Sequence, residues 1–289
     1  MSGRGIDDLG KTFDRYRVDR FPSFESLEDS QSEDSSRERC LLRSLRRGLI
    51  DPTLAMPLIL DLQEAEAEGV PAESLASSVY MRQLRISVCG NIWELLDSIE
   101  ASHFNRYARA FTIVPKSWEF KASELANVDP TALIKSLRTA LYDQGAKDEL
   151  GWLIAIIHGE FDPIAKVYRL HVHGLAFGGM VQAIDRLRRL PNYQSRSKDT
   201  DGRPNSVYRR VVVNRMPLTN LPQPITYLVQ SFWPSRAVII SDDGTRIRQR
   251  DKGRIPEPYH SEVLLWLNRW RLTDLTLMIG LRVDRKSVV

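Results

Sequence analysis

The chain has 289 residues, of which 42% are hydrophobic and 27% charged, a composition typical of a globular protein that folds in water. No run of about 18 apolar residues occurs, which excludes a membrane-spanning helix, and the first residues lack the apolar core of a signal peptide. The formal net charge is +4, and the two cysteines, Cys40 and Cys89, lie too far apart in the sequence to indicate a disulfide framework or a cysteine zinc site. We therefore expect a cytoplasmic protein without a membrane partner.

The N-terminal third is expected to be helical after a polar arm. Residues 1–38 are rich in Ser, Glu and Asp, which predicts disorder. Residues 39–105 show helical periodicity, and Asp51 followed by Pro52 is a typical helix start in which the Asp side chain caps the first turn. The apolar stripes of this region indicate packing surfaces. We expect an α-helical region that docks on the rest of the chain or serves as an interaction module.

From residue 106 onward, segments with strand character alternate with helical ones. The predicted order is β-α-β-β-α-β-α, with strands over 110–115, 151–161, 168–177 and 207–214, and helices over 130–144, 180–190 and 224–232. This order predicts an α+β fold with a central antiparallel sheet and helices on one face. Residues 106–257 would form this domain, including a hairpin near 238–247, and residues 258–289 a C-terminal helix and a tail.

The strand over 168–177 carries His171 and His173. Side chains at alternate positions of a strand point to the same face, so the two imidazoles are expected to lie side by side. Imidazole is a common metal ligand, and two of them on one face can share a divalent cation. Taken alone, the pair is also compatible with a half-exposed sheet face that binds nothing.

Charge is unevenly spread along the chain. Between Arg186 and Arg254 there are 15 Lys and Arg against 5 Asp and Glu, and the remainder of the chain is acidic. A basic stretch of this kind indicates a polyanionic partner, nucleic acid above all. Residues expected to contact phosphate groups are Arg209, Arg210, Arg215, Arg236 and Lys116.

Three short motifs occur in a fixed order on these elements. Phe111-Thr112-Ile113-Val114-Pro115 lies on the first strand, His171-Val172-His173 on the third, and Ile225-Thr226-Tyr227-Leu228-Val229-Gln230 on the helix after the fourth. Over about 125 residues this arrangement resembles the HUH endonuclease superfamily, more narrowly the rolling-circle replication initiators of plasmids and phages. The resemblance implies a Rep-like sheet with the histidine strand at its centre.

The resemblance also implies an activity. His171, His173 and a third polar side chain would hold Mg²⁺ or Mn²⁺, which polarises the scissile phosphate. Tyr227 would attack single-stranded or hairpin DNA and become joined to its 5′ phosphate, leaving a free 3′ hydroxyl. Such nicking and joining would initiate replication of a plasmid, phage or mobile element. A host helicase is an expected partner, because the chain has no phosphate-binding Gly-x-x-x-x-Gly-Lys-[Ser/Thr] loop.

Three residues compete for the place of the third ligand. With a turn centred near Ala165, Glu160 would lie opposite His171 and on the same face, and His158 would point the same way. Gln230, one helical turn after Tyr227, is the third option. Glu160 is the expected third ligand, and His158 and Gln230 are the alternatives.

Gln230 is also a departure from the pattern, because replication initiators usually carry Lys at that position. Single-Tyr transposases place a Gln near the Tyr as a metal ligand, so a transposase or relaxase-like enzyme is one alternative. A DNA-binding protein on the same scaffold without catalysis is another. A metal-dependent hydrolase of small phosphoesters has no support from the charge distribution. The sequence carries no indication of the oligomeric state.

Overall fold

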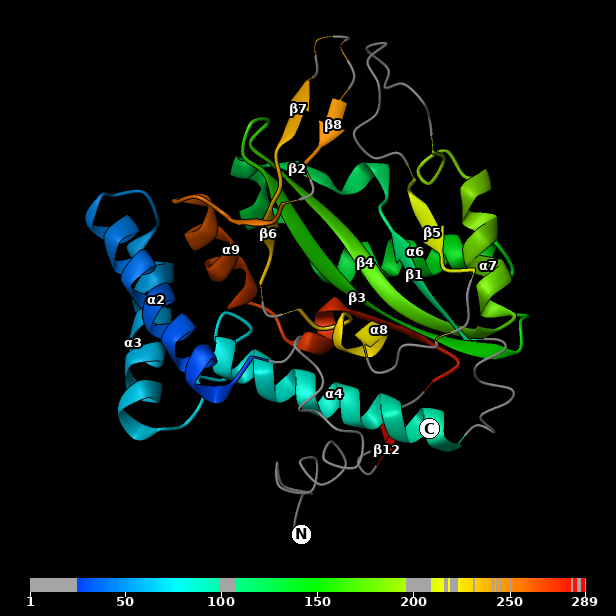
Figure 1. The fold of residues 1–289 in the computed structure, drawn as a ribbon, viewed down its shortest axis with the longest axis horizontal. Helices are drawn as coiled ribbons and strands as arrows, with labels where there is room; N and C mark the ends of the chain where they lie inside the picture. Colours follow the sequence, from blue (N-terminus) through cyan, green and yellow to red (C-terminus); the bar gives the residue numbers. More distant parts are fainter. Residues whose placement is uncertain are drawn as a thin grey trace.

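Two long antiparallel strands, β3 (Gly151–Asp162) and β4 (Val167–Gly178), cross the centre of the molecule (Figure 1). They belong to a computed structural model that describes residues 25–98, 108–195, 209–215, 218, 223–230, 232–240, 242, 244, 246–249, 251–281, 283–284 and 287–288. Both strands are rich in β-branched and aromatic residues, which favour extended backbone. Almost every side chain of β3 is buried, so this strand lies in the interior of the fold.

A curled, mostly antiparallel sheet extends from this pair (Figure 1). Its order is β5-β1-β4-β3-β6-β9, with β2 pairing along β4 and β10 along β3. Of the pairings described, β3 with β6 is parallel. The remaining members are β1 (Arg109–Ile113), β2 (Glu119–Lys121), β5 (Val211–Val213), β6 (Pro234–Ser235), β9 (Gly253–Arg254) and β10 (Thr276–Ile279). The predicted α+β fold with a central antiparallel sheet is thus confirmed, with the histidine strand in the middle.

The turn between β3 and β4 decides which side chains face each other. The Asp162 Oδ1 atom accepts hydrogen bonds from the backbone N–H groups of Ile164 and Ala165, at 3.0 and 3.2 Å. This side-chain bond sets a loop of four residues, 163–166, and the register that follows pairs His158 with His171. The predicted pairing of Glu160 with His171 is therefore wrong, because Glu160 lies opposite Arg169. All of these side chains share one face of the sheet, as expected.

Helical segments contact both faces of the sheet, whereas the sequence indicated one. On the histidine face, the loop after α8 (Gln223–Thr226) contacts His158 through the Leu228 carbonyl. On the other face, the Trp233 ring lies against Gly159 and packs on Trp266 of α9 (Tyr259–Leu267), with ring centroids 5.3 Å apart. Two further helices, α6 (Pro130–Asp143) and α7 (Met180–Arg186), follow the predicted order.

The N-terminal helices begin earlier than predicted. Helix α2 (Leu27–Arg46) starts at Ser26, whose hydroxyl accepts from the Asp29 backbone N–H at 3.0 Å while the Asp29 carboxylate accepts in return. This capping box stabilises the first turn of a polar segment, so residues 27–38 are helix and not a disordered arm. Arg37 in this segment is buried and donates to the Ala76 carbonyl at 2.8 Å. Residues 1–24 lie outside the described part of the chain.

Helices α3 (Pro52–Glu68) and α4 (Ser78–Ser98) complete the N-terminal region. Asp51 caps α3 as predicted, its Oδ1 atom accepting from the Thr53 N–H at 2.8 Å. Helix α2 contacts α3, α4 and α9, which docks this region on the sheet (Figure 1). No helix in the described ranges combines the length and the apolar character needed to cross a membrane.

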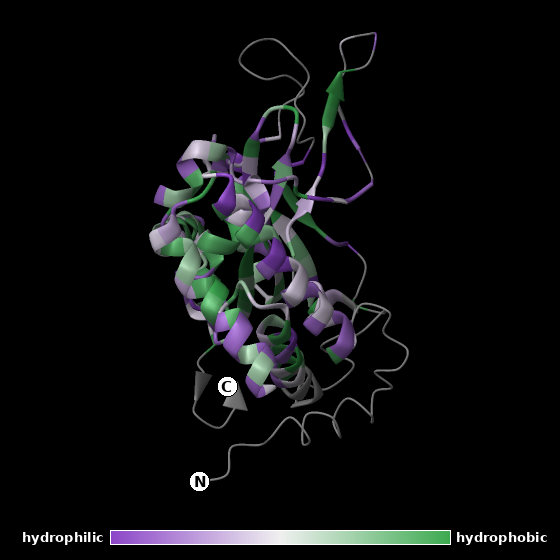
Figure 2. Ribbon diagram, turned by 90° about the vertical axis from the view of Figure 1, so that its left-hand side faces the viewer, coloured by the Kyte–Doolittle hydropathy of each residue, from purple (hydrophilic) through white to green (hydrophobic). Residues whose placement is uncertain are grey.

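The C-terminal segment is part of the same fold. Strand β10 pairs with β3 from Leu153 to Ile156, so residues predicted as an unassigned tail complete the sheet. Two small hairpins stand outside it, β11 (Val283–Asp284) with β12 (Ser287–Val288), and the predicted β7 (Val238–Ile240) with β8 (Arg246–Arg248). Seen from the side, the β7–β8 hairpin projects away from the helices (Figure 2).

Candidate functional site

One hollow of about 150 Å³ on the histidine face brings together six of the residues predicted from the sequence, and we call it the His-pair pocket. It collects side chains from β1, β3, β4, the loop after α8 and the segments around β6 and β8. Its lining includes Thr112, Glu160, His171, His173, Tyr227, Gln230, Arg236, Arg248 and Lys252. The first and the last of the three motifs are more than a hundred residues apart in the sequence, and the strand order brings them together.

The two histidines of the motif present their Nε2 atoms to each other. These atoms are 3.1 Å apart, and the rings meet edge to face with centroids 4.7 Å apart. On the opposite edge of each ring, Nδ1 has its own partner. His173 Nδ1 lies 2.9 Å from the Thr112 hydroxyl, and His171 Nδ1 lies 3.3 Å from the Arg169 carbonyl.

These Nδ1 contacts orient both rings toward a common ligand. The Arg169 carbonyl can only accept, so His171 carries its proton on Nδ1 and directs the Nε2 lone pair into the pocket. The Thr112 hydroxyl can accept from His173 in the same way. Imidazoles that bind metals are commonly held through the other ring nitrogen in this manner. The pair therefore fits a divalent cation.

Burial keeps the histidines of this face neutral. It lowers the pKa of His171 to about 4 and that of His158 to about 3, because a charged imidazole loses its hydration inside the protein. Burial lowers the pKa of His173 as well, helped by the neighbouring His171 and His158. A neutral imidazole is the form that binds metal, so the pair is in its ligating form at neutral pH.

Tyr227 stands at the mouth of the pocket with 42% of its surface exposed. Its ring packs edge to face on His173, with centroids 4.7 Å apart. The Lys252 ammonium donates to the Tyr227 hydroxyl at 3.3 Å. Burial alone would raise the pKa of Tyr227, but a hydrogen bond with Gln230 and the positive charges of Lys252 and Arg236 outweigh it and lower the pKa. The hydroxyl is thus accessible and easier to deprotonate than a free tyrosine.

The predicted helical position of Tyr227 is wrong. Helix α8 ends at Thr226, and Tyr227 lies in the turn that follows. The Leu228 N–H bonds to the Ile225 carbonyl at 3.0 Å, and the Leu228 carbonyl meets His158 Nε2 at 2.5 Å. Because this carbonyl is held by the sheet, the segment cannot continue as a helix.

The three candidates for the third ligand have different surroundings. Glu160 forms an ion pair with Arg248, and no cluster of three His, Cys, Asp or Glu ligand atoms forms around the His pair within the described residues. His158 is buried and committed to the Leu228 carbonyl. Gln230 lines the pocket and reaches Tyr227. Gln230 is therefore the candidate with the freest access to the His pair.

Cations surround the rest of the pocket. Arg236, Arg248 and Lys252 all line it, against the single carboxylate of Glu160. The Nε atoms of Arg236 and Arg248 are buried and have no hydrogen-bond partner among the described residues. Guanidinium groups bind phosphate through such N–H groups, so the pocket offers donors to an anion placed next to the His pair.

Other predicted phosphate contacts lie outside this lining. Arg209, Arg215 and Lys116 are exposed on the surface. Arg210 is only 8% exposed and donates to the Val114 carbonyl at 3.2 Å, so its guanidinium helps to hold β5 beside β1. Of the arginines predicted to bind phosphate, Arg236 is the one that lines the pocket.

Sequence reasoning missed Arg248 and Lys252. Both lie in the basic stretch that the sequence marks, but nothing in their spacing from the motifs indicates that they return to the histidine face. Their positions depend on the β7–β8 hairpin and on β9, which bring the chain back beside Glu160 and Tyr227.

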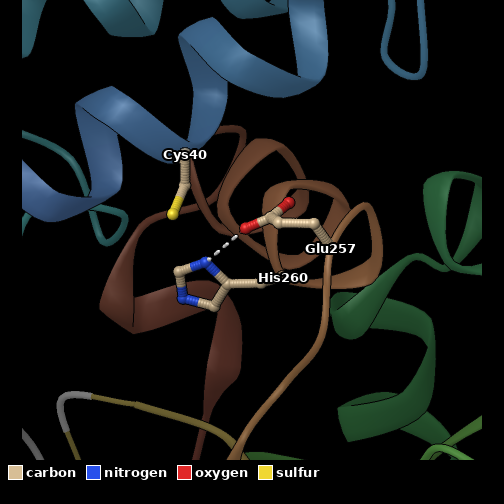
Figure 3. A group of neighbouring side chains, drawn as sticks. All are labelled: Cys40, Glu257 and His260. Carbon is tan, nitrogen blue, oxygen red and sulfur yellow. Dashed lines mark ion pairs between the residues drawn. The ribbon is translucent and has the colours of Figure 1, made fainter. Parts of the chain in front are cut away.

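A second group of ligand-type side chains lies elsewhere. Cys40, Glu257 and His260 each offer one atom, all within 4.8 Å of one another, and could hold a metal ion. We call them the Cys–Glu–His cluster. It lies between α2 and the start of α9 (Figure 3).

Comparison with known proteins adds no relative, since no family model, curated protein or solved structure matches the chain.

Proposed function

We propose that the chain is an HUH-type, metal-dependent enzyme that nicks and rejoins single-stranded DNA through a 5′-phosphotyrosine intermediate. The observation that carries this proposal is the His-pair pocket, in which a neutral histidine pair, an accessible tyrosine and three cations meet. DNA is the expected substrate because the surrounding stretch is strongly basic.

His171, His173 and Gln230 would hold the Mg²⁺ or Mn²⁺ ion. When bound, the ion supplies Lewis-acid stabilisation of the charge on the scissile phosphate. The Nδ1 contacts with the Arg169 carbonyl and the Thr112 hydroxyl hold the imidazole rings in place. Glu160 stays paired with Arg248 in this arrangement and positions that guanidinium.

Tyr227 is the nucleophile. Its oxygen attacks phosphorus, an O–P bond to tyrosine forms, the bond between phosphorus and the 3′ oxygen breaks, and that oxygen leaves as a 3′ hydroxyl after taking a proton. The Lys252 ammonium, 3.3 Å from the hydroxyl, stabilises the phenolate. Replication initiators carry a Lys three residues after the Tyr, and here Lys252 supplies the cation from a distant segment.

Arg236 and Arg248 bind the phosphate oxygens through their free Nε–H groups. The charge that develops on these oxygens is stabilised by donors already in place, which is the main source of rate in phosphate chemistry. Strand joining is the reverse reaction at the same site. The biological setting would be initiation of replication for a plasmid, phage or mobile element, with a host helicase to open the duplex.

Gln230 gives weight to a related activity. Single-Tyr transposases also place a Gln ligand near the Tyr, at a different spacing, so a transposase or relaxase-like reaction would use the same residues in the same roles. The chemistry at Tyr227 is identical in both cases. The two differ in the DNA that is recognised and in what happens to the free 3′ hydroxyl.

The test is trapping of the covalent intermediate. Purified protein is mixed with labelled single-stranded oligonucleotides that tile the DNA flanking its own gene, with Mn²⁺ or with EDTA, and run on a denaturing gel. We expect an adduct that needs Mn²⁺ and is absent in Tyr227→Phe, with cleavage reduced by about 10³-fold or more. Tyr142→Phe is the matched control, since Tyr142 on α6 is also exposed, at 38%, and lies outside the pocket lining.

Each other outcome has a definite meaning. An adduct that persists in Tyr227→Phe would transfer the nucleophile role to another residue. Tight binding to one of the oligonucleotides without adduct or cleavage in Mn²⁺ would refute the enzyme and leave a DNA-binding protein without catalysis.

A further inference from the structure

Three side chains that the DNA chemistry does not use meet between α2 and α9. Cys40 comes from the middle of α2, Glu257 precedes α9, and His260 lies in its first turn. Their ligand atoms lie within 4.8 Å of one another. Figure 3 shows the Cys40 thiol and the Glu257 carboxylate on the same side of the imidazole as Nδ1, the nitrogen that the dashed line joins to Glu257. The sequence separates Cys40 from the other two by more than two hundred residues, so the cluster is a product of the fold.

Hydrogen bonds fix the carboxylate of this cluster. Glu257 Oε2 accepts from the Ser44 hydroxyl at 3.0 Å and from the Ser261 hydroxyl at 2.6 Å. These two donors come from α2 and α9, on either side of the carboxylate. They leave Oε1 directed at His260, 3.3 Å from its Nδ1 atom. Outer hydrogen bonds of this kind orient the carboxylate ligands of metals.

His260 supplies the observation that points to a ligand. Its side chain is more than nine-tenths buried, and within the described part of the chain its Nδ1 atom has no hydrogen-bond partner. The nearest oxygen, Glu257 Oε1, does not have hydrogen-bond geometry and can pair with the ring only if the ring is charged. A buried nitrogen without a partner is unfavourable. A cation among Nδ1, Oε1 and the Cys40 sulfur would satisfy all three atoms.

We propose that Cys40, Glu257 and His260 form a Zn²⁺ site that ties the N-terminal helices to the sheet. A sulfur, an imidazole nitrogen and a carboxylate oxygen are the donors that Zn²⁺ takes in proteins, whereas Mg²⁺ and Ca²⁺ prefer oxygen alone. Binding releases the Cys40 thiol proton to solvent and forms a zinc–thiolate bond. Three protein ligands leave a fourth position for water, which completes a tetrahedron.

The consequence is a metal-dependent joint between two parts of the molecule. Helix α2 contacts α3 and α4 on one side and α9 on the other. A metal that bridges Cys40 and His260 therefore links the N-terminal helices to α9, which packs on the sheet through Trp266. Because the metal binds only the folded arrangement, its binding raises the stability of the whole chain.

The test uses the full chain, stripped of metal and then titrated with Co²⁺ as a spectroscopic substitute for Zn²⁺. We expect a near-ultraviolet charge-transfer band of a Co²⁺–thiolate bond, at one ion per chain, that Zn²⁺ displaces. Cys40→Ala and His260→Gln should weaken Zn²⁺ binding at least about 100-fold, measured by competition with a chromogenic chelator. In the His171→Ala/His173→Ala background, which lacks the other proposed metal site, Zn²⁺ should raise the melting temperature, and adding Cys40→Ala should abolish that rise.

Two controls make the outcome decisive. Cys89→Ala removes the other cysteine, which is buried in α4, and should keep the band and the affinity. The double variant His171→Ala/His173→Ala should also keep both. Absence of a thiolate band in the wild type would overturn the proposal, whatever the folding of the variants, and would leave the cluster as a polar contact in which the thiol donates to Glu257. A band that survives in Cys40→Ala would overturn it as well.

Discussion

The His-pair pocket contains two imidazoles and the Cys–Glu–His cluster one, each beside other possible ligand atoms, but the surroundings of the two regions differ in charge and in access. The pocket is open, holds an exposed tyrosine and is lined by Arg236, Arg248 and Lys252. The cluster is enclosed between two helices, and its carboxylate is fixed by two serine hydroxyls. Cations around a metal site attract a negatively charged substrate, whereas an enclosed site with a thiol retains its metal. The types of ligand present are therefore not enough to decide what a metal site does.

The two regions are also connected by a path of packed residues. Glu160 of the pocket follows Gly159 along β3, the Trp233 ring covers Gly159, and Trp233 packs on Trp266 of α9. The same helix begins with His260. Three predictions separate the two regions or test this path.

The largest effect is expected from removing the His pair. In His171→Ala/His173→Ala, Mn²⁺-dependent cleavage and Mn²⁺ affinity should fall at least about 100-fold, because both proposed imidazole ligands are gone. Calorimetric titration with Mn²⁺ and the gel assay measure the two quantities. Cys40→Ala should keep both near the wild-type values. Equal losses of cleavage and Mn²⁺ affinity in the two variants would show that one metal site serves both regions, which would contradict the distinction between them.

A smaller effect is expected at the path between the regions. A Cβ atom at Gly159 would overlap the Trp233 ring, so Gly159→Ala should lower the free energy of unfolding by about 1–3 kcal/mol, as overpacking of a core does. Urea unfolding measures this change. Gly253→Ala is the matched control, because its new methyl group would meet nothing nearer than 4.0 Å. An unchanged stability in Gly159→Ala would mean that Trp233 moves freely and that the regions are not coupled there.

The third prediction concerns pH. Unfolded histidine has a pKa of about 6.5, whereas burial lowers the pKa of His158 to about 3 and that of His171 to about 4. At pH values between the unfolded pKa and the lower pKa of the folded state, the unfolded chain binds more protons than the folded one. The free energy of unfolding therefore falls as the pH is lowered from about 6.5 toward 4. From pH 7 to pH 5 we expect a loss of about 1–2 kcal/mol per histidine, in EDTA.

The carboxylate of the cluster does not titrate in this window. Burial alone would raise the pKa of Glu257, but the neighbouring His260 and hydrogen bonds from the Ser261 and Ser44 hydroxyls outweigh it and lower the pKa to about 2. Its contribution to stability is present above about pH 4.5 and is lost only as the pH falls toward 2. Because His158 is one of the groups responsible for the fall in stability between pH 7 and pH 5, this fall should be smaller in His158→Gln than in the wild type. Urea unfolding at the two pH values checks this, and a wild type equally stable at both would contradict it.

Much of the fold could be predicted from patterns local in the sequence. The apolar, β-branched runs that became β3 and β4, the order of strands and helices, and the Asp51 cap all follow from side-chain periodicity and capping chemistry. The start of α2 was missed because its first turns are polar, although Ser26 and Asp29 carry a capping signal. Strand β10 was missed because a short edge strand has little pattern of its own.

The candidate site, too, could be predicted in part from local sequence patterns. Alternation along β4 was enough to place His171 and His173 on one face, and burial of that face makes both neutral. The side chains that complete the pocket were decided by the tertiary structure. The Asp162 turn set the register opposite His171, the His158 contact ended α8 before Tyr227, and the return of the chain after β8 brought Arg248 and Lys252 to the site.

The sequence by itself thus determined the elements, the histidine pair and the basic stretch, because each depends on residues close together in the chain. Only the tertiary structure decided which cations meet Tyr227 and that Cys40 lies beside Glu257 and His260. Such contacts join residues that are far apart in the sequence, and their positions depend on turn geometry and packing that no local pattern records.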